Sequence, residues 1–191
     1  MNELRVELLR RSGLDQAARR TKDWDAIRAV DAENLPWLKH VIAEVGWPGK
    51  SIAGEDGASA AWLLVQHADQ DPVFQRQCLD LLTEAADGDE ATALQVAYLT
   101  DRVLLHEGQP QEFGTQAIGK NGRWIPRPLR DPEGVDERRA RVGLGPLDEY
   151  LDDMLAHYGP PAAPRPAADQ PAGDEAGTGR RPAREPFHQY S

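Results

Sequence analysis

Residues 58–69 read ASAAWLLVQHAD and residues 91–102 read ATALQVAYLTDR, and these two stretches decide the fold. Helical turns of about 3.6 residues place apolar side chains on almost every side of both segments, which is typical of buried helices. Between them, residues 71–82 read DPVFQRQCLDLL and have one apolar face. The sequence therefore predicts two central helices, the most buried of the chain, with an amphipathic helix between them.

A carboxylate interrupts the apolar surface of the second stretch. On a helical projection, Asp101 falls between Leu94, Ala97 and Leu105. Burying an uncompensated carboxylate costs several kcal/mol, so Asp101 must be paired, hydrogen-bonded or protonated. This residue therefore needs a partner from elsewhere in the fold.

A histidine poses the same question in the first stretch, where His67 projects beside Ala60, Leu63 and Leu64. Two interpretations remain open. In one, His67 is a core histidine that is hydrogen-bonded to a nearby carbonyl or carboxylate. In the other, His67 is the base of a functional site and Asp101 is the carboxylate that orients it.

The composition restricts the class of protein. The chain has 191 residues and a formal net charge of −10, which argues against binding to nucleic acid or to an anionic membrane. The single cysteine, Cys78, excludes an intramolecular disulfide and fits a reducing cytosol. No stretch approaches the roughly 20 apolar residues of a membrane span, so a cytoplasmic protein is expected.

Further helices are predicted before the central pair, and a loop follows them. An apolar stripe along residues 2–20 predicts a helix. Asp15 and Arg19 lie one turn apart on it, with the spacing of an ordinary surface ion pair. Asp23 is expected to cap a short helix, and Asn34 to cap the next, which ends at Gly46. The glycine-containing residues 47–54 are expected to form a loop.

Beyond the central pair the pattern changes. Asn121-Gly122 lies between two β-favourable runs and predicts a hairpin over 115–126, followed by short helices at 136–142 and from Pro146. The fold class expected is mainly α, an orthogonal helical bundle with one small β-hairpin, in a domain that covers residues 1–158. Residues 159–191 are rich in Pro, Ala and Gly and predict a disordered tail.

Five short motifs, in this order, resemble a bacterial family catalogued as a domain of unknown function. They are DQxxR at 15–19, GWP at 46–48, QHAD at 66–69, AYLTDR at 97–102 and FGTQ at 113–116. The likeness covers about residues 2–155. It implies a mainly helical domain with a small hairpin, and it supplies no activity.

The polar residues that periodicity does not explain form the candidate site. Its catalytic pair is His67 and Asp101; its ligand-binding residues are Trp47, Gln66, Arg102, Thr115 and Gln116. The planar donor fork of Arg102 suits a small polar or anionic ligand with a carboxylate or phosphate. No cofactor is expected, and no metal, since the HADQD spacing at 67–71 matches no established metal motif.

Two other functions remain open. The same residues are compatible with a buried structural network in an acidic protein-interaction module, of accessory or immunity-like kind. Alternatively, the aromatic end of the tail, with Phe187, His188 and Tyr190, is a docking or substrate peptide presented by a flexible linker.

Overall fold

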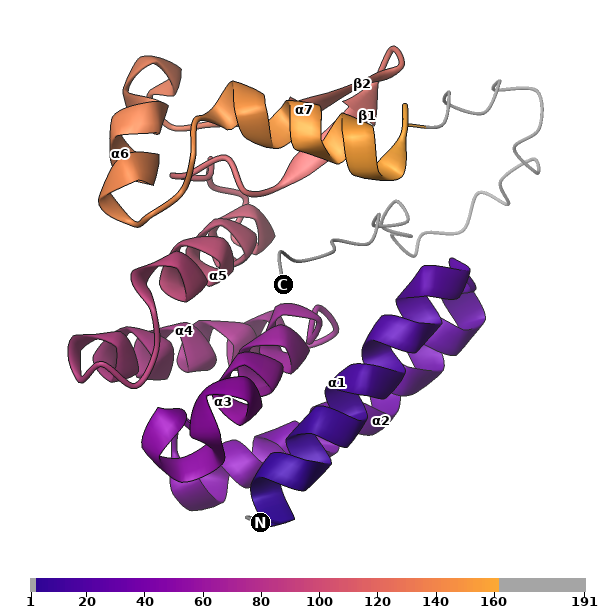
Figure 1. Cartoon of the computed structure of the whole chain (residues 1–191), viewed down its shortest axis with the longest axis vertical. Helices are drawn as coiled ribbons and strands as arrows, with labels where there is room; N and C mark the ends of the chain where they lie inside the picture. Colours follow the sequence, from indigo (N-terminus) through magenta and orange to yellow (C-terminus); the bar gives the residue numbers. More distant parts are fainter. Residues whose placement is uncertain (1–2, 162–191) are drawn as a thin grey trace, which may run out of the picture.

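The computed structural model describes residues 3–161 and is mainly helical (Figure 1), as predicted. These residues form seven α-helices, one short 3-10 turn and one antiparallel hairpin. The helices are α1 (Glu3–Thr21), α2 (Trp24–Val45), α3 (Lys50–Gln66), α4 (Pro72–Asp87), α5 (Ala93–His106), α6 (Val135–Arg141) and α7 (Leu147–Tyr158). The strands are β1 (Ala117–Lys120) and β2 (Arg123–Pro126), and the 3-10 turn η1 is Pro132–Gly134.

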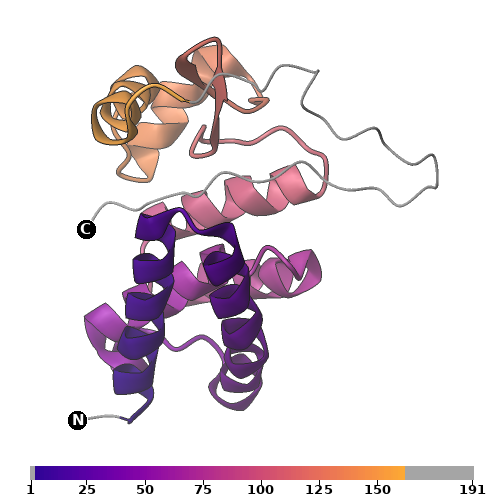
Figure 2. The same cartoon turned by 90° about the vertical axis from the view of Figure 1, so that its right-hand side faces the viewer.

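The first five helices share one hydrophobic core. Figure 2 shows α1 and α2 side by side, and α1 packs on both α2 and α3. The central part of this core contains fully buried Leu8, Val65, Leu82 and Leu99. Burial of the later half of α3 is as predicted. In α5, Ala97, Leu99, Asp101, Arg102 and Val103 are buried, whereas Leu94, Leu104 and Leu105 of its apolar surface stay partly exposed.

The hairpin, α6 and α7 form a second apolar cluster beyond α5 (Figures 1 and 2). Ala117, Val135, Leu147, Tyr150 and Met154 are its buried members. The hairpin pairs Ala117 with Pro126, and Asn121 and Gly122 turn between the strands with positive φ, as the sequence predicts. Helix α5 thus lies between the two clusters.

The sequence prediction for residues 24–45 is wrong in one respect. Asp23 caps the N-terminus as expected, accepting from the amides of Asp25 (3.0 Å) and Ala26 (3.2 Å), but the helix continues unbroken through Pro36. Asn34 does not cap a second helix; its side chain is buried and accepts a hydrogen bond from Arg11 at 3.0 Å. Packing of one face of α2 outweighs the amide bond that Pro36 cannot make.

The expected loop before the central helix is shorter than predicted. Helix α3 begins at Lys50, and Glu90 accepts from the backbone amide of Ser51 at 2.7 Å, so an acidic side chain satisfies the first turn. The helix then kinks at Gly54, where φ is 73° and ψ is 165°, a conformation that glycine adopts at low cost.

The described chain extends slightly beyond the predicted domain boundary at residue 158. The Gly159 carbonyl accepts from the Trp124 indole at 3.0 Å, and Pro161 is buried against Gly119. The remainder of the predicted disordered tail, with the docking peptide that contains Phe187, His188 and Tyr190, lies outside the described residues. Within 3–161, no helix is both long and apolar enough to cross a membrane.

Candidate functional site

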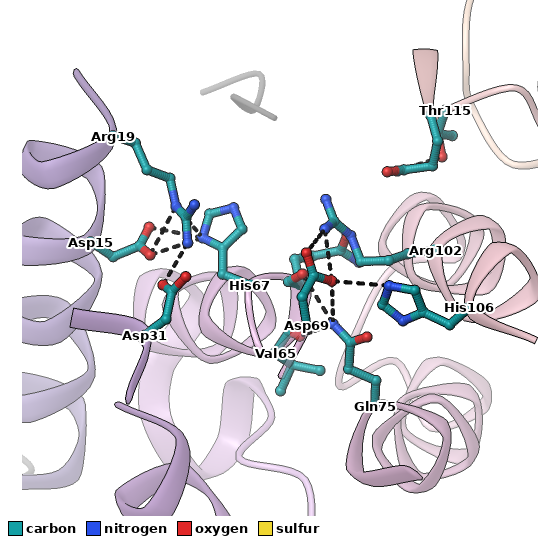
Figure 3. A network of polar contacts seen from close by, with 12 residues as sticks. Asp15, Arg19, Asp31, Val65, His67, Asp69, Gln75, Arg102, His106 and Thr115 are labelled. Atoms are coloured by element: carbon teal, nitrogen blue, oxygen red, sulfur yellow. Dashed lines mark hydrogen bonds and ion pairs between the residues drawn. The ribbon is translucent and has the colours of Figure 1, made fainter. Parts of the chain in front are cut away.

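The candidate site is built around the turn between α3 and α4. Helix α3 ends at Gln66, His67 is its C-cap residue, and the chain turns before Asp71 caps α4 by accepting from the Phe74 amide at 3.0 Å. This short turn sends neighbouring side chains in different directions. As Figure 3 shows, His67 extends toward α1, whereas Asp69 extends toward α5.

On the α1 side, His67 belongs to a buried charged cluster with Asp15, Arg19 and Asp31 (Figure 3). The Nδ1 atom of His67 lies 2.9 Å from an Asp15 carboxylate oxygen. Arg19 donates from Nε to Asp15 at 3.1 Å and from Nη2 to Asp31 at 2.6 Å. His67, Asp15 and Arg19 are only 6%, 1% and 6% exposed, so these charges interact with little screening by water.

The electrostatics of this cluster determine where the imidazole proton lies. Burial lowers the pKa of His67 and outweighs the opposing effect of Asp15. Burial acts to raise the pKa of Asp15, but the His67 ring, its hydrogen bond and Arg19 hold that pKa below its ordinary value. The Nε atom of Arg19 also lies 3.0 Å from Nδ1, but a charged donor bonds more strongly to the carboxylate beside it. An ionised carboxylate only accepts hydrogen bonds, so the Asp15 contact favours a neutral His67 ring that donates from Nδ1 and carries its lone pair on Nε2.

Asp31 is the second carboxylate of the cluster. Burial raises its pKa to about 6, because the attraction of Arg19 only partly offsets the lost hydration and Asp15 adds repulsion. Its side chain remains 15% exposed. Asp31 therefore changes its charge near neutral pH, beside a histidine whose proton is already positioned.

On the α5 side, buried Arg102 and partly exposed Asp69 form a second charged cluster. Arg102 donates from Nη1 to Asp69 at 3.0 Å and from Nε to Gln66 at 3.1 Å. His106 Nε2 lies 3.4 Å from Asp69, and Gln75 donates to the same carboxylate at 3.3 Å. The guanidinium is thus held in a fixed orientation by an amide and a carboxylate.

The two clusters lie next to each other. Figure 3 shows the His67 ring and the Arg102 guanidinium on the same side of the α3–α4 turn. The charge of Arg102 contributes to lowering the pKa of His67, and the charge of Asp69 contributes to raising that of Asp31. A buried imidazole, two guanidinium groups and three carboxylates therefore influence one another across this turn.

Asp101 does not pair with His67, so the expected orienting role belongs to Asp15. The carboxylate of Asp101 instead accepts from the backbone amides of Glu112 (2.7 Å), Phe113 (3.0 Å) and Thr115 (2.8 Å). It also accepts from the Thr115 hydroxyl at 2.9 Å. Burial raises the pKa of Asp101, and these donors act in the opposite direction. Asp101 is thus buried because its carboxylate bonds to the backbone of the loop at residues 112–115.

The remaining predicted ligand-binding residues lie in separate surroundings. The side-chain amide of Gln116 donates to the Thr115 hydroxyl at 3.2 Å, and its backbone amide donates to Gln111 at 3.0 Å. Trp47 lines a different cavity of about 360 Å³, between the start of α3 and the ends of α2 and α4. Of the expected set, only Gln66, His67 and Arg102 meet at the α3–α4 turn.

Comparison with known proteins identifies the family. Residues 3–161 match the model of a family of unknown function, DUF6624. The chain belongs to this family. No curated protein and no solved structure matches it. The expected membership of a family without known activity is confirmed, whereas the five motifs and a bacterial origin stay predictions.

Three residues of this candidate site were missed by reasoning from helical periodicity. Asp15 and Arg19 have the spacing of a surface pair, and only the unusual DQxxR motif at 15–19 signalled them. Asp31 carries no signal at all, because its importance comes from the distance to Arg19. Among residues 3–161, no group of His, Cys, Asp and Glu is arranged to hold a metal ion. The two acidic residues of HADQD have different partners. Asp69 pairs with Arg102, whereas Asp71 caps α4 and pairs with Lys39.

Proposed function

We propose that the α3–α4 turn is a binding site for a small anionic molecule, with His67 as its acid–base group. The observation that carries this proposal is the hydrogen bond between His67 Nδ1 and the buried carboxylate of Asp15 at 2.9 Å. This contact favours the tautomer whose Nε2 accepts a proton, an arrangement used for general bases.

Arg102 supplies the attraction for the anion in this proposal. Its position beside His67 is fixed by Gln66 and Asp69, and a planar guanidinium suits a carboxylate or phosphate. The proposed ligand-binding residues are therefore Gln66 and Arg102, with Asp15 and Arg19 orienting His67. Thr115 and Gln116 are not part of the proposed site because they bond to Asp101 and to each other. Trp47 is not part of it because it lines a separate cavity.

The first experiment tests the tautomer. Long-range ¹H–¹⁵N spectra of the imidazole rings should show His67 protonated on Nδ1 at pH 7.5, and Asp15→Asn should abolish this preference. Exposed His40, on α2, is the internal reference and should be unaffected by the substitution. A His67 ring protonated on Nε2 in the unmodified protein would remove the basis of the proposal.

The second experiment tests the ligand class by thermal shift with phosphate, pyrophosphate, acetate and citrate. A ligand present at about ten times its Kd should raise Tm by roughly 3–5 °C. Arg102→Ala should lose this shift, whereas Arg76→Ala, which removes a surface arginine paired with Glu107, should keep it. Equal shifts in both variants would contradict a role for Arg102.

The net charge of −10 favours a second candidate, a protein-interaction module that meets a basic partner. In that case the buried clusters serve only to hold α1, α3 and α5 together. Binding of a purified basic partner would weaken strongly as the salt concentration rises, and substitutions at His67 would not change it. Anion binding that depends on Arg102 would favour the first candidate.

A further inference from the structure

A second cavity lies on the opposite side of α5 and is unrelated to the α3–α4 turn. Its volume is about 270 Å³, and it is enclosed by α5, the loop from α6 to α7, and α7. Its lining includes Leu94, Tyr98, Arg139, Leu144, Glu149 and Tyr150. This volume is at the small end of the range for small-molecule sites.

Arg139 is the unusual member of this lining. Only 2% of it is exposed, and it donates to the carbonyls of Gly145 at 2.6 Å and Phe113 at 2.7 Å. Its guanidinium carbon lies 5.2 Å from the centre of the Tyr150 ring. Among residues 3–161, both hydrogen bonds of the Arg139 guanidinium, from Nε and Nη1, go to backbone carbonyls and not to a carboxylate.

The lack of a carboxylate in direct contact separates Arg139 from Arg19 and Arg102. Arg19 and Arg102 each contact a carboxylate within 3.1 Å, as buried positive charges normally do. Burial lowers the pKa of Arg139, which reflects the cost of holding its charge away from water. Asp136 and Asp101 attract this charge without contacting it and only partly offset the effect of burial. Because arginine stays protonated in proteins, an anion in the cavity would add the direct ion pair that Arg139 lacks among the described residues.

The other walls limit what that anion can be. Leu94, Leu144 and the ring of Tyr98 offer apolar surface. Glu149 and Asp153, one turn apart on α7, bring two negative charges to the same cavity. They repel a free phosphate or a dicarboxylate and attract a positive group. A positive charge inside and two negative charges at the edge match a molecule that carries both charges.

We propose that this cavity binds a small zwitterion with an apolar or aromatic side chain, of the amino-acid class. Its carboxylate pairs with Arg139, its ammonium group faces Glu149 and Asp153, and its side chain lies against Leu94 and Tyr98. The site is independent of the acid–base site at His67, so either can fail without the other.

The test uses calorimetry on the full chain with three related probes: L-phenylalanine, 3-phenylpropionate and 2-phenylethylamine. The first carries both charged groups, the second lacks the ammonium group, and the third lacks the carboxylate. L-Phenylalanine should bind at least about tenfold more tightly than either of the others, because each lacks one ionic contact. If no probe binds in the millimolar range, or if 3-phenylpropionate binds as tightly as L-phenylalanine, the proposal is overturned.

Paired variants locate the binding. Glu149→Gln and Arg139→Lys should each weaken L-phenylalanine binding about tenfold, since the first removes the charge and the second removes the planar fork. The matched controls are Asp148→Asn, on the neighbouring exposed position of α7, and Arg141→Lys, on the exposed side of α6; both should bind normally.

Folding is checked by the melting temperature of each variant. If Arg139→Lys fails to fold, exposed Glu149 decides the outcome, because its substitution removes no buried contact. Binding of L-phenylalanine that is unchanged in Glu149→Gln would overturn the proposed orientation of the ligand in the cavity.

Discussion

Asp31 and His67 belong to one buried cluster, and their pKa values move in opposite directions. The pKa of Asp31 rises from 3.8 to about 6, so its contribution to stability is fully present below pH 3.8 and is lost as pH rises through about 6. The pKa of His67 falls below 6.5, so its contribution is present above that pH and is lost as pH falls through the lowered value. As pH rises, the Asp31 contribution to the free energy of unfolding therefore falls, while the His67 contribution grows.

Substituting Asp31 separates the two effects. An asparagine side chain cannot ionise, so Asp31→Asn should gain stability relative to the unmodified protein as pH rises from about 4 to about 7. The difference between 3.8 and about 6 corresponds to at most roughly 3 kcal/mol. Urea unfolding across this range measures it. The control is Glu33→Gln on the exposed side of α2, which should show no such trend. A pH-independent difference for Asp31→Asn would contradict the raised pKa.

At the scale of elements, the loop from residue 112 to 115 is held from two sides. The Asp101 carboxylate, on α5, accepts hydrogen bonds from backbone amides of this loop. The loop carbonyls accept hydrogen bonds from Arg138 (2.9 Å), Arg139 (2.7 Å) and Tyr150 (2.9 Å) of α6 and α7. The loop thus joins α5 to the second apolar cluster through its backbone. Such buried backbone groups are costly to leave without partners.

Asp101→Asn should therefore destabilise the protein by roughly 2–4 kcal/mol, because the asparagine amide points a donor at backbone donors. Thr115→Val removes only the hydroxyl contact and should cost about 1 kcal/mol. Hydrogen exchange should accelerate at Phe113 and Thr115 in Asp101→Asn, and remain unchanged in α1. Slow exchange in the loop of this variant would show that the carboxylate is not what holds it.

At the scale of the whole molecule, the two apolar clusters meet at α5, and the described chain ends by packing on the hairpin. A Cβ atom at Gly119 would lie 2.2 Å from the Cβ atom of Pro161, so this glycine is needed for the contact. Deletion of residues 160–191 would remove buried Pro161 and with it this contact.

A chain of residues 1–161 should melt a few degrees above a chain of residues 1–159, which corresponds to about 1 kcal/mol for one buried apolar contact. Gly119→Ala should lower Tm in the 1–161 chain and have a smaller effect in the 1–159 chain, because the clashing partner is absent. Differential scanning calorimetry of both chains, each with and without Gly119→Ala, measures the coupling between the two changes. Equal effects of Gly119→Ala in both chains would contradict the contact.

The sequence by itself determined the elements and the positions that needed partners. Periodicity predicted the buried half of α3, the Asp23 cap predicted the start of α2, and Asn121-Gly122 predicted the hairpin. These features depend on neighbours within a few residues. Only the tertiary structure decided the partners: His67 meets Asp15 at a separation of 52 residues, whereas Asp101 meets a loop. Helical periodicity states which side chains face inward, but charge pairing depends on which helices pack together, so the orienting residue of the site was predicted wrongly.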